Sequence, residues 1–226
     1  MKPREIFGMK TVLCLIALLT AFSALRADTA SGADGRCGTV DELTRTVMVT
    51  RGGRETELAQ GDAVYSSDSI KTGELGYAVI KFIDDTLMAI GGNGSVVITE
   101  VQFTPRAARF HLGIDRGAVW ISIGSIGLVN PNAVKLTTPK ALVSSGNATI
   151  QFEVGGEENV KVQWIPKGGR VSVYSVKTKE RMEMRETDST IFITSGGELS
   201  TKPAETPEDE GRSASEGPIE EETAGQ

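Results

Sequence analysis

The residue types that most often do chemistry in proteins are scarce in this chain. It holds one histidine, His111, and two cysteines, Cys14 and Cys37. His111 alternates with Phe110 and Leu112, so on a strand it faces the opposite side, toward solvent. One histidine and two cysteines are too few ligands for a zinc or copper site of the usual kinds. A Ser–His–Asp arrangement would have to use His111, and no serine lies in the glycine pattern of a nucleophile elbow.

Two further segments carry groups that could act in catalysis or phosphate binding. Asp84 and Asp85 are adjacent, whereas paired catalytic carboxylates are held ~5 Å apart across a cleft and usually come from distant positions. We therefore predict a hairpin turn there. The segment Gly91-Gly92-Asn93-Gly94-Ser95 lacks the Lys-Ser/Thr ending of a phosphate loop and opens no helix, so it also predicts a turn. The sequence thus predicts a protein that is not an enzyme, with no catalytic, metal-binding or cofactor-binding residue; the binding residues stay unknown.

The two tryptophans, Trp120 and Trp164, both lie in apolar runs that are typical of strands. Large aromatic side chains dominate the burial of apolar surface, so we interpret both as core anchors. The alternative is a platform for stacking sugars, which requires aromatic faces exposed in a groove.

Short runs with a period of two fill the middle of the chain, which is typical of β-strands. Turn signals rich in glycine and aspartate separate these runs, and no long helical period follows residue 27. We predict an all-β fold in which many short strands form a sandwich or a β-roll, or a solenoid-like domain. The predicted strands include 76–82, 95–99, 109–114, 118–123, 160–164, 171–174 and 191–193.

The first residues have the order of a secretory leader. Basic residues Lys2, Arg4 and Lys10 precede an apolar run at 12–19, and small residues follow up to a cleavage site near Ala27. The alternative is a retained anchor, but the run is shorter than the ~20 residues of a spanning helix. We expect an exported protein, which for a bacterium means one that is periplasmic or secreted, with no stable membrane span after cleavage.

Composition divides the chain into four parts: a signal peptide at 1–27, a linker or first strand at 28–45, a β-domain at 46–197, and a tail at 198–226. Residues 197–226 carry nine acidic and two basic residues, a net charge of −7. We predict that this tail is disordered, because it cannot bury enough apolar surface; the alternative is an acidic arm that docks a basic partner. The β-domain itself is close to charge balance, so nothing indicates nucleic-acid binding.

Cys37 is the one cysteine left once a leader containing Cys14 is removed. No internal disulfide can then form in an oxidising compartment. We interpret Cys37 as an inert thiol near a mobile terminus, and the alternative is an intermolecular disulfide.

An ordered series of segments resembles the FecR-like domain family of bacterial envelope proteins, over residues 46–176. The resemblance implies an all-β domain that faces the periplasm, a protein partner in the cell envelope, and in the best-known members a signal passed to a sigma factor. The chain offers no segment for sigma control before the apolar run. We therefore expect a stand-alone FecR-like domain that acts in protein interaction or signalling. The alternative is a carbohydrate- or cell-wall-binding β-domain. Asp85 stands where the family usually has glycine, so this turn must tolerate a left-handed or type I geometry. The series comprises Gly61-Asp62-Ala63-Val64, Asp68-Ser69-Ile70-Lys71-Thr72-Gly73, Gly76-Tyr77-Ala78-Val79-Ile80-Lys81-Phe82, Asp84-Asp85-Thr86-Leu87, Ser95-Val96-Val97-Ile98, Gly117-Ala118-Val119-Trp120, Thr138-Pro139-Lys140-Ala141-Leu142-Val143 and Phe152-Glu153-Val154.

Overall fold

The computed structural model describes residues 35–104, 107–155, 159–165, 169–185 and 189–201. The predicted leader and residues 202–226 of the predicted tail lie outside these ranges. Within them, no helix is both long enough and apolar enough to cross a membrane.

The described chain consists almost wholly of β-strands, which confirms the predicted fold class. The strands form two sheets. Sheet A contains, in spatial order, β1 (Arg36–Thr44), β6 (Tyr77–Phe82), β7 (Leu87–Ile90), the C-terminal half of β9 (Ala107–Ser122), β12 (Thr149–Val154), β13 (Val160–Ile165), β16 (Thr190–Ile193) and β17 (Leu199–Ser200). Sheet B contains β3 (Arg54–Glu57), β2 (Val47–Arg51), β5 (Ser69–Thr72), β8 (Ser95–Thr104), the N-terminal half of β9, β10 (Val134–Thr137), β11 (Ala141–Ser145), β14 (Val171–Ser175) and β15 (Arg181–Glu183). The short strand β4 (Ala63–Tyr65) pairs with β1.

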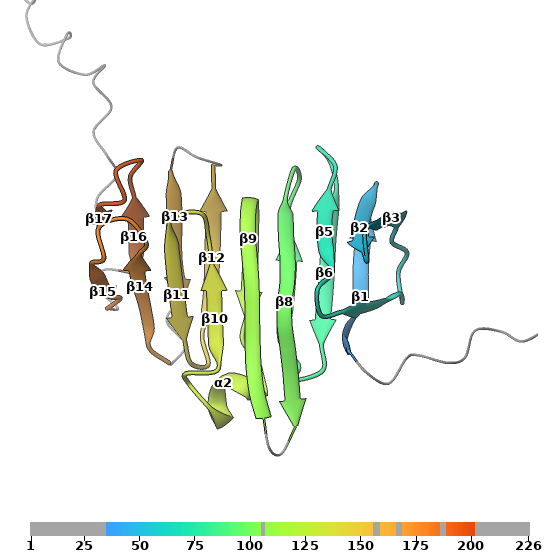
Figure 1. Cartoon of the computed structure of the whole chain (residues 1–226), viewed down its shortest axis with the longest axis horizontal. Helices are drawn as coiled ribbons and strands as arrows, with labels where there is room; N and C mark the ends of the chain where they lie inside the picture. Colours follow the sequence, from blue (N-terminus) through green and yellow to red (C-terminus); the bar gives the residue numbers. More distant parts are fainter. Residues whose placement is uncertain (1–34, 105–106, 156–158, 166–168, 186–188, 202–226) are drawn as a thin grey trace, which may run out of the picture. The chain divides into compact units, whose positions relative to one another are not determined.

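From β10 onward, successive hairpins alternate between the two sheets. The hairpins β6–β7, β12–β13 and β16–β17 belong to sheet A, and β10–β11 and β14–β15 belong to sheet B. Each sheet therefore gains strands in chain order, which Figure 1 shows as a progression of colour across the strands. The pairing of β9 with β10 is parallel, and the other pairings that define the strand orders of sheets A and B are antiparallel.

Strand β9 belongs to both sheets. Its first part pairs with β8 and β10 in sheet B, and residues 117–122 pair with β12 in sheet A. The strand passes from sheet B to sheet A at Gly117, whose φ of 96° lies in the region that favours glycine. The set of buried residues also shifts by one position there, from Phe110, Leu112 and Ile114 to Val119 and Ile121. The prediction of two separate strands at 109–114 and 118–123 is wrong, because one strand passes from sheet to sheet.

The inner faces of the two sheets share one hydrophobic core. Phe82 of sheet A and Phe110 of sheet B meet edge to face, with ring centroids 4.9 Å apart. Both rings are buried, and the core continues through residues of nearly all strands. The outer faces of the sheets are therefore the surfaces that remain for binding.

Two other details differ from the sequence prediction. A five-residue helix, α2 (Ser125–Val129), follows β9; it is too short for a helical period to show in the sequence. Leu199 and Ser200, assigned to the tail, form β17 and pair with β16. The edge of β16 presents backbone N–H and C=O groups with which the following residues can pair. This pairing does not depend on the side-chain composition from which the tail was predicted.

Candidate functional site

Trp120 lies on the outer face of sheet A, so the prediction that it is a core anchor is wrong. Its neighbours Val119 and Ile121 are buried, whereas Trp120 is partly exposed. Trp164 is buried in the core, so the same prediction is confirmed for that residue. One signal in the sequence marks the outer face: Ser122 is polar and shares a side of the strand with Trp120.

The strand register surrounds Trp120 with small and amide side chains. Trp120 lies opposite Ala89 of β7 on one side and opposite Gln151 of β12 on the other. Gln163 of β13 follows in the same cross-strand row, and all four residues are partly exposed. Ala89 has a small side chain that can cover little of the indole, and the amides of Gln151 and Gln163 can both donate and accept hydrogen bonds.

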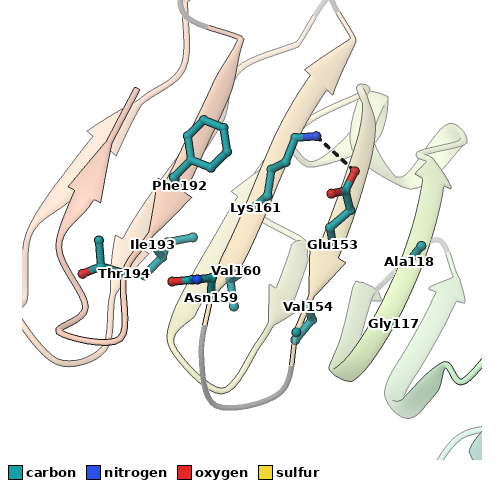
Figure 2. A pocket seen from close by; sticks show the side chains of 11 residues that line it. Gly117, Ala118, Glu153, Val154, Asn159, Val160, Lys161, Phe192, Ile193 and Thr194 are labelled. Atoms are coloured by element: carbon teal, nitrogen blue, oxygen red, sulfur yellow. Dashed lines mark hydrogen bonds and ion pairs between the residues drawn. The ribbon is translucent and has the colours of Figure 1, made fainter. Parts of the chain in front are cut away.

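A second cross-strand row lies next to the first and borders a groove. It runs from Ala118 through Glu153 and Lys161 to Phe192. Figure 2 shows Glu153, Lys161 and Phe192 on three neighbouring strands around this groove, which has a volume of about 460 Å³. The space exists because Gly117 and Ala118 leave little side-chain volume on this part of β9.

The ion pair in this groove leaves its surface close to neutral. The Lys161 ammonium lies 3.0 Å from the Glu153 carboxylate, and both side chains are partly exposed. Such exposed pairs contribute between zero and about 1 kcal/mol to stability. Together the two rows, which we call the Trp120 face (Ala89, Ala118, Trp120, Gln151, Glu153, Lys161, Gln163 and Phe192), offer an aromatic surface, two amides and one balanced charge pair. This set suits binding by stacking and hydrogen bonding.

His111 lies on the opposite, outer face of sheet B, which confirms that it points away from the core. Its Nδ1 is 3.8 Å from a carboxylate oxygen of Glu100, which also pairs with Arg109 at 3.0 Å. Partial burial and the nearby charges of Lys135 and Arg109 lower the pKa of His111, against the opposing effect of Glu100. These groups do not meet the residues of the Trp120 face, which lie in sheet A.

The predicted turn at Asp84 and Asp85 is confirmed. The Asp85 N–H donates to the Phe82 carbonyl oxygen at 3.1 Å, and Asp85 has a φ of 64°, the left-handed geometry expected for this position. Asp84 is buried, and its carboxylate accepts hydrogen bonds from Thr86 and from the N–H of Ile126. The two aspartates thus face different surroundings and do not form a catalytic pair.

The predicted turn at residues 91–95 is also confirmed. The N–H of Gly94 donates to the Thr72 hydroxyl at 2.8 Å, and that hydroxyl donates to the carbonyl oxygen of Gly91. Asn93 has a left-handed φ of 54°. Within the described ranges, no group of three or more histidine, cysteine, aspartate or glutamate side chains is placed to hold a metal ion.

The prediction that Cys37 lies near a mobile terminus is wrong, because Cys37 belongs to strand β1 and its side chain is fully inside the core. Its thiol is 3.5 Å from the carbonyl oxygen of Val64, to which it donates. A disulfide to another chain would require β1 to leave its sheet. Burial, with a smaller contribution from the charge of Asp68, raises the pKa of the Cys37 thiol from 9.0 to about 12.

This raised pKa predicts a pH dependence of stability. Between pH 9 and about 12 the unfolded chain loses the Cys37 proton while the folded chain keeps it, so the free energy of unfolding falls as the pH rises. In this range we expect the free energy of unfolding of the wild-type chain to fall by about 1 kcal/mol per pH unit more than that of Cys37→Ala. Urea unfolding of both chains at pH 8, 9, 10 and 10.5 measures the difference. If the free energy of unfolding falls equally with pH in the two chains, the pKa of the Cys37 thiol is not raised by burial.

Comparison with known proteins finds little. No protein-family model matches the sequence, and no curated protein matches it. Two crystal structures from Parabacteroides distasonis, each described as a "putative anti-sigma factor", match 58% of this chain with a TM-score of 0.46 and with 14% and 13% sequence identity. The matched region spans 57% of each of those chains. A likeness of this extent assigns neither a family nor a function to the present chain.

Proposed function

We propose that this protein is an exported, non-catalytic interaction module of the bacterial cell envelope, and that the Trp120 face is its contact surface. The leader-like sequence at 1–27 and the resemblance of residues 46–176 to FecR-like domains support the setting. The outward position of Trp120 carries the proposal for the surface. This residue belongs to an apolar run but faces outward and does not contribute to the core.

The Trp120 face has the properties of a protein contact site. Tryptophan is enriched among the residues that dominate binding energy, where it lies at the centre of a patch that excludes water. Trp120 occupies such a position, with Ala89 and Gln151 beside it and the groove of Lys161 and Phe192 next to it. These side chains project from strands hydrogen-bonded on both sides, so little conformational freedom is lost when a partner binds.

Site-directed photocrosslinking in the cells that produce the protein tests this surface. A photoreactive residue in place of Gln163, two strands from Trp120 in the same cross-strand row, is expected to give one discrete protein adduct. The same residue in place of Lys71, on the outer face of sheet B, is the matched control and is expected to give none. Trp120→Ala in the Gln163 chain should reduce the adduct by about tenfold or more, since a central tryptophan contributes 2 kcal/mol or more to binding. Equal adducts from both positions, or none from Gln163 under several growth conditions, would contradict the proposal.

One observation favours a second candidate, a glycan of the cell wall. An exposed indole stacks on the apolar face of a sugar ring, and amides such as Gln151 and Gln163 donate to and accept from its hydroxyls. Trp164→Phe leaves Trp120 as the one fluorescent indole, since the chain has two tryptophans. A saturable fluorescence shift of this variant with oligomers of N-acetylglucosamine would support the glycan. An unchanged spectrum, together with a protein adduct at Gln163, would exclude it.

A further inference from the structure

A second surface lies on sheet B, whereas the Trp120 face lies on sheet A. It contains a cavity of about 800 Å³, which is larger than the groove of the Trp120 face. It lies at the outer side of sheet B, between α2 and the strands β11, β14 and β15. The strand register places Ser144, Ser172 and Glu183 in one row across its floor.

One wall of this cavity is apolar and strongly exposed. Leu128 of α2 and Pro131 line it, and Leu128 is 71% exposed. Val129, the next residue of the helix, is 68% exposed. Exposure of the Leu128 side chain costs hydrophobic free energy that an occupant of the cavity would recover.

The opposite wall carries positive charge. Arg170 and Arg181 both line the cavity and are exposed, and Glu183 is the one acidic residue among the lining residues. The Arg181 guanidinium donates to the Ser172 hydroxyl at 3.1 Å, which holds it along the floor. Lys135 adds a further cation in the same row, because it lies opposite Ser144. Guanidinium groups with free N–H donors favour carboxylate ligands.

The framework of the cavity is fixed by backbone contacts. The N–H of Gly146 donates to the carbonyl oxygen of Arg170 at 3.2 Å. The Asn147 side-chain amide donates to the carbonyl oxygens of Ile123 and Gly124, which connects this turn to the start of α2. Gly169 has a φ of 77° and approaches the Asn147 backbone so closely that a side chain at 169 would collide with it. The two walls are therefore held in place without a ligand.

The chain itself contains a segment of complementary chemistry. Among residues 202–226, Ile219 is the one large aliphatic residue, and Glu220, Glu221 and Glu222 follow it directly. We propose that the segment Ile219–Glu222 binds this cavity in the same molecule, with Ile219 against Leu128 and Pro131 and the glutamates against Arg170 and Arg181. The acidic tail then has a basic partner within its own chain.

Chain length permits this contact. The stretch from Thr201 to Ile219 spans up to roughly 60 Å when extended, which is ample for any surface of a domain this size. The link also raises the effective concentration of the segment to the order of 1 mM, so that even a weak site is substantially occupied. The glutamate–arginine part of the contact should weaken as salt rises.

Paramagnetic relaxation in NMR tests the proposal with the full chain. A nitroxide is attached to Ala224→Cys in a chain with Cys14→Ser; the buried Cys37 thiol stays unlabelled. The amide signals of Gly127, Gly146 and Gly169 are expected to lose about half of their intensity or more, as an effective concentration on the order of 1 mM implies for a weak site. Amides of β2 and β5, at the far edge of sheet B, should keep theirs.

Matched variants separate the specific contact from general attraction. Arg170→Gln with Arg181→Gln, or Ile219→Ser, should restore the three glycine signals. One control removes two cations elsewhere, by Arg54→Gln with Lys71→Gln. A second control removes three tail charges away from Ile219, by Glu205→Gln, Glu208→Gln and Glu210→Gln. Both controls should leave the loss of signal unchanged. Evenly spread losses, or none, would overturn the proposal.

A mixed sample distinguishes the same molecule from a second copy. Isotope-labelled chain without nitroxide is combined with unlabelled chain that carries the nitroxide. If the signals of Gly127, Gly146 and Gly169 keep their intensity in this mixture, the contact is within one chain. If they are lost there as well, the occupant is the tail of another copy, and the proposed intramolecular contact is wrong.

Discussion

Replacing Asp84 by alanine is expected to lower the free energy of unfolding by about 3 kcal/mol, a large effect for one residue in a turn. The Asp84 carboxylate is buried and accepts from the Thr86 hydroxyl at 2.7 Å and from the N–H of Ile126 at 3.3 Å. The Thr86 hydroxyl in turn accepts from the N–H of Gly124 at 2.9 Å. Alanine would leave buried donors unpaired at the junction between the β6–β7 turn and α2.

Asp85 provides the matched control for this measurement. It is the next residue, carries the same charge, and is exposed, with a surface ion pair to Lys81 at 3.1 Å. Asp85→Asn keeps a residue that tolerates the left-handed φ of 64° and should change stability by less than about 1 kcal/mol. Urea unfolding of both variants at pH 7 gives the comparison. Similar losses for Asp84→Ala and Asp85→Asn would show that the buried network does not hold α2.

Gly117→Ala is expected to cost about 3 kcal/mol, because two effects act at one position. Its φ of 96° is unfavourable for any residue with a side chain. A Cβ there would also lie 2.7 Å from the Cα of Gly94, so the backbone of the neighbouring turn would have to move. Because β9 passes between the sheets at this residue, the strain would act on both.

Gly113 is the control for Gly117, since it lies in the same strand at an ordinary position. A Cβ at Gly113 would meet its nearest neighbours at 3.7 Å, a normal contact distance. Gly113→Ala should therefore change the free energy of unfolding by less than about 1 kcal/mol. Thermal and urea unfolding of the two variants measure the difference. If Gly117→Ala is as stable as Gly113→Ala, the passage of β9 from one sheet to the other does not depend on glycine.

Much of the local structure could be predicted because it depends on local signals. The turns at Asp84–Asp85 and Gly91–Ser95 follow from residues that accept unusual backbone angles. The inward positions of Val160, Val162 and Trp164 follow from strict alternation with polar residues.

The candidate site could not be predicted in the same way. The run Ala118–Ile123 is apolar at nearly every position, so alternation does not say which side of the strand faces the core. Gln151, Gln163 and Phe192 come from strands far along the chain, and only pairing across sheet A brings them near Trp120. The cavity beside α2 likewise depends on segments from 127 to 183.

The sequence by itself determined the all-β class, the positions of the turns, the acidic C-terminal segment and the shortage of catalytic side chains. These properties depend on composition and on neighbours within a few residues. Tertiary structure decided which sheet each strand joins, where the phase of burial changes along β9, and that Cys37 lies inside the core. Those outcomes depend on pairing between distant segments. A shift of one residue in a strand exchanges its two faces, and at Gly117 such a shift turns Trp120 from the core to the surface.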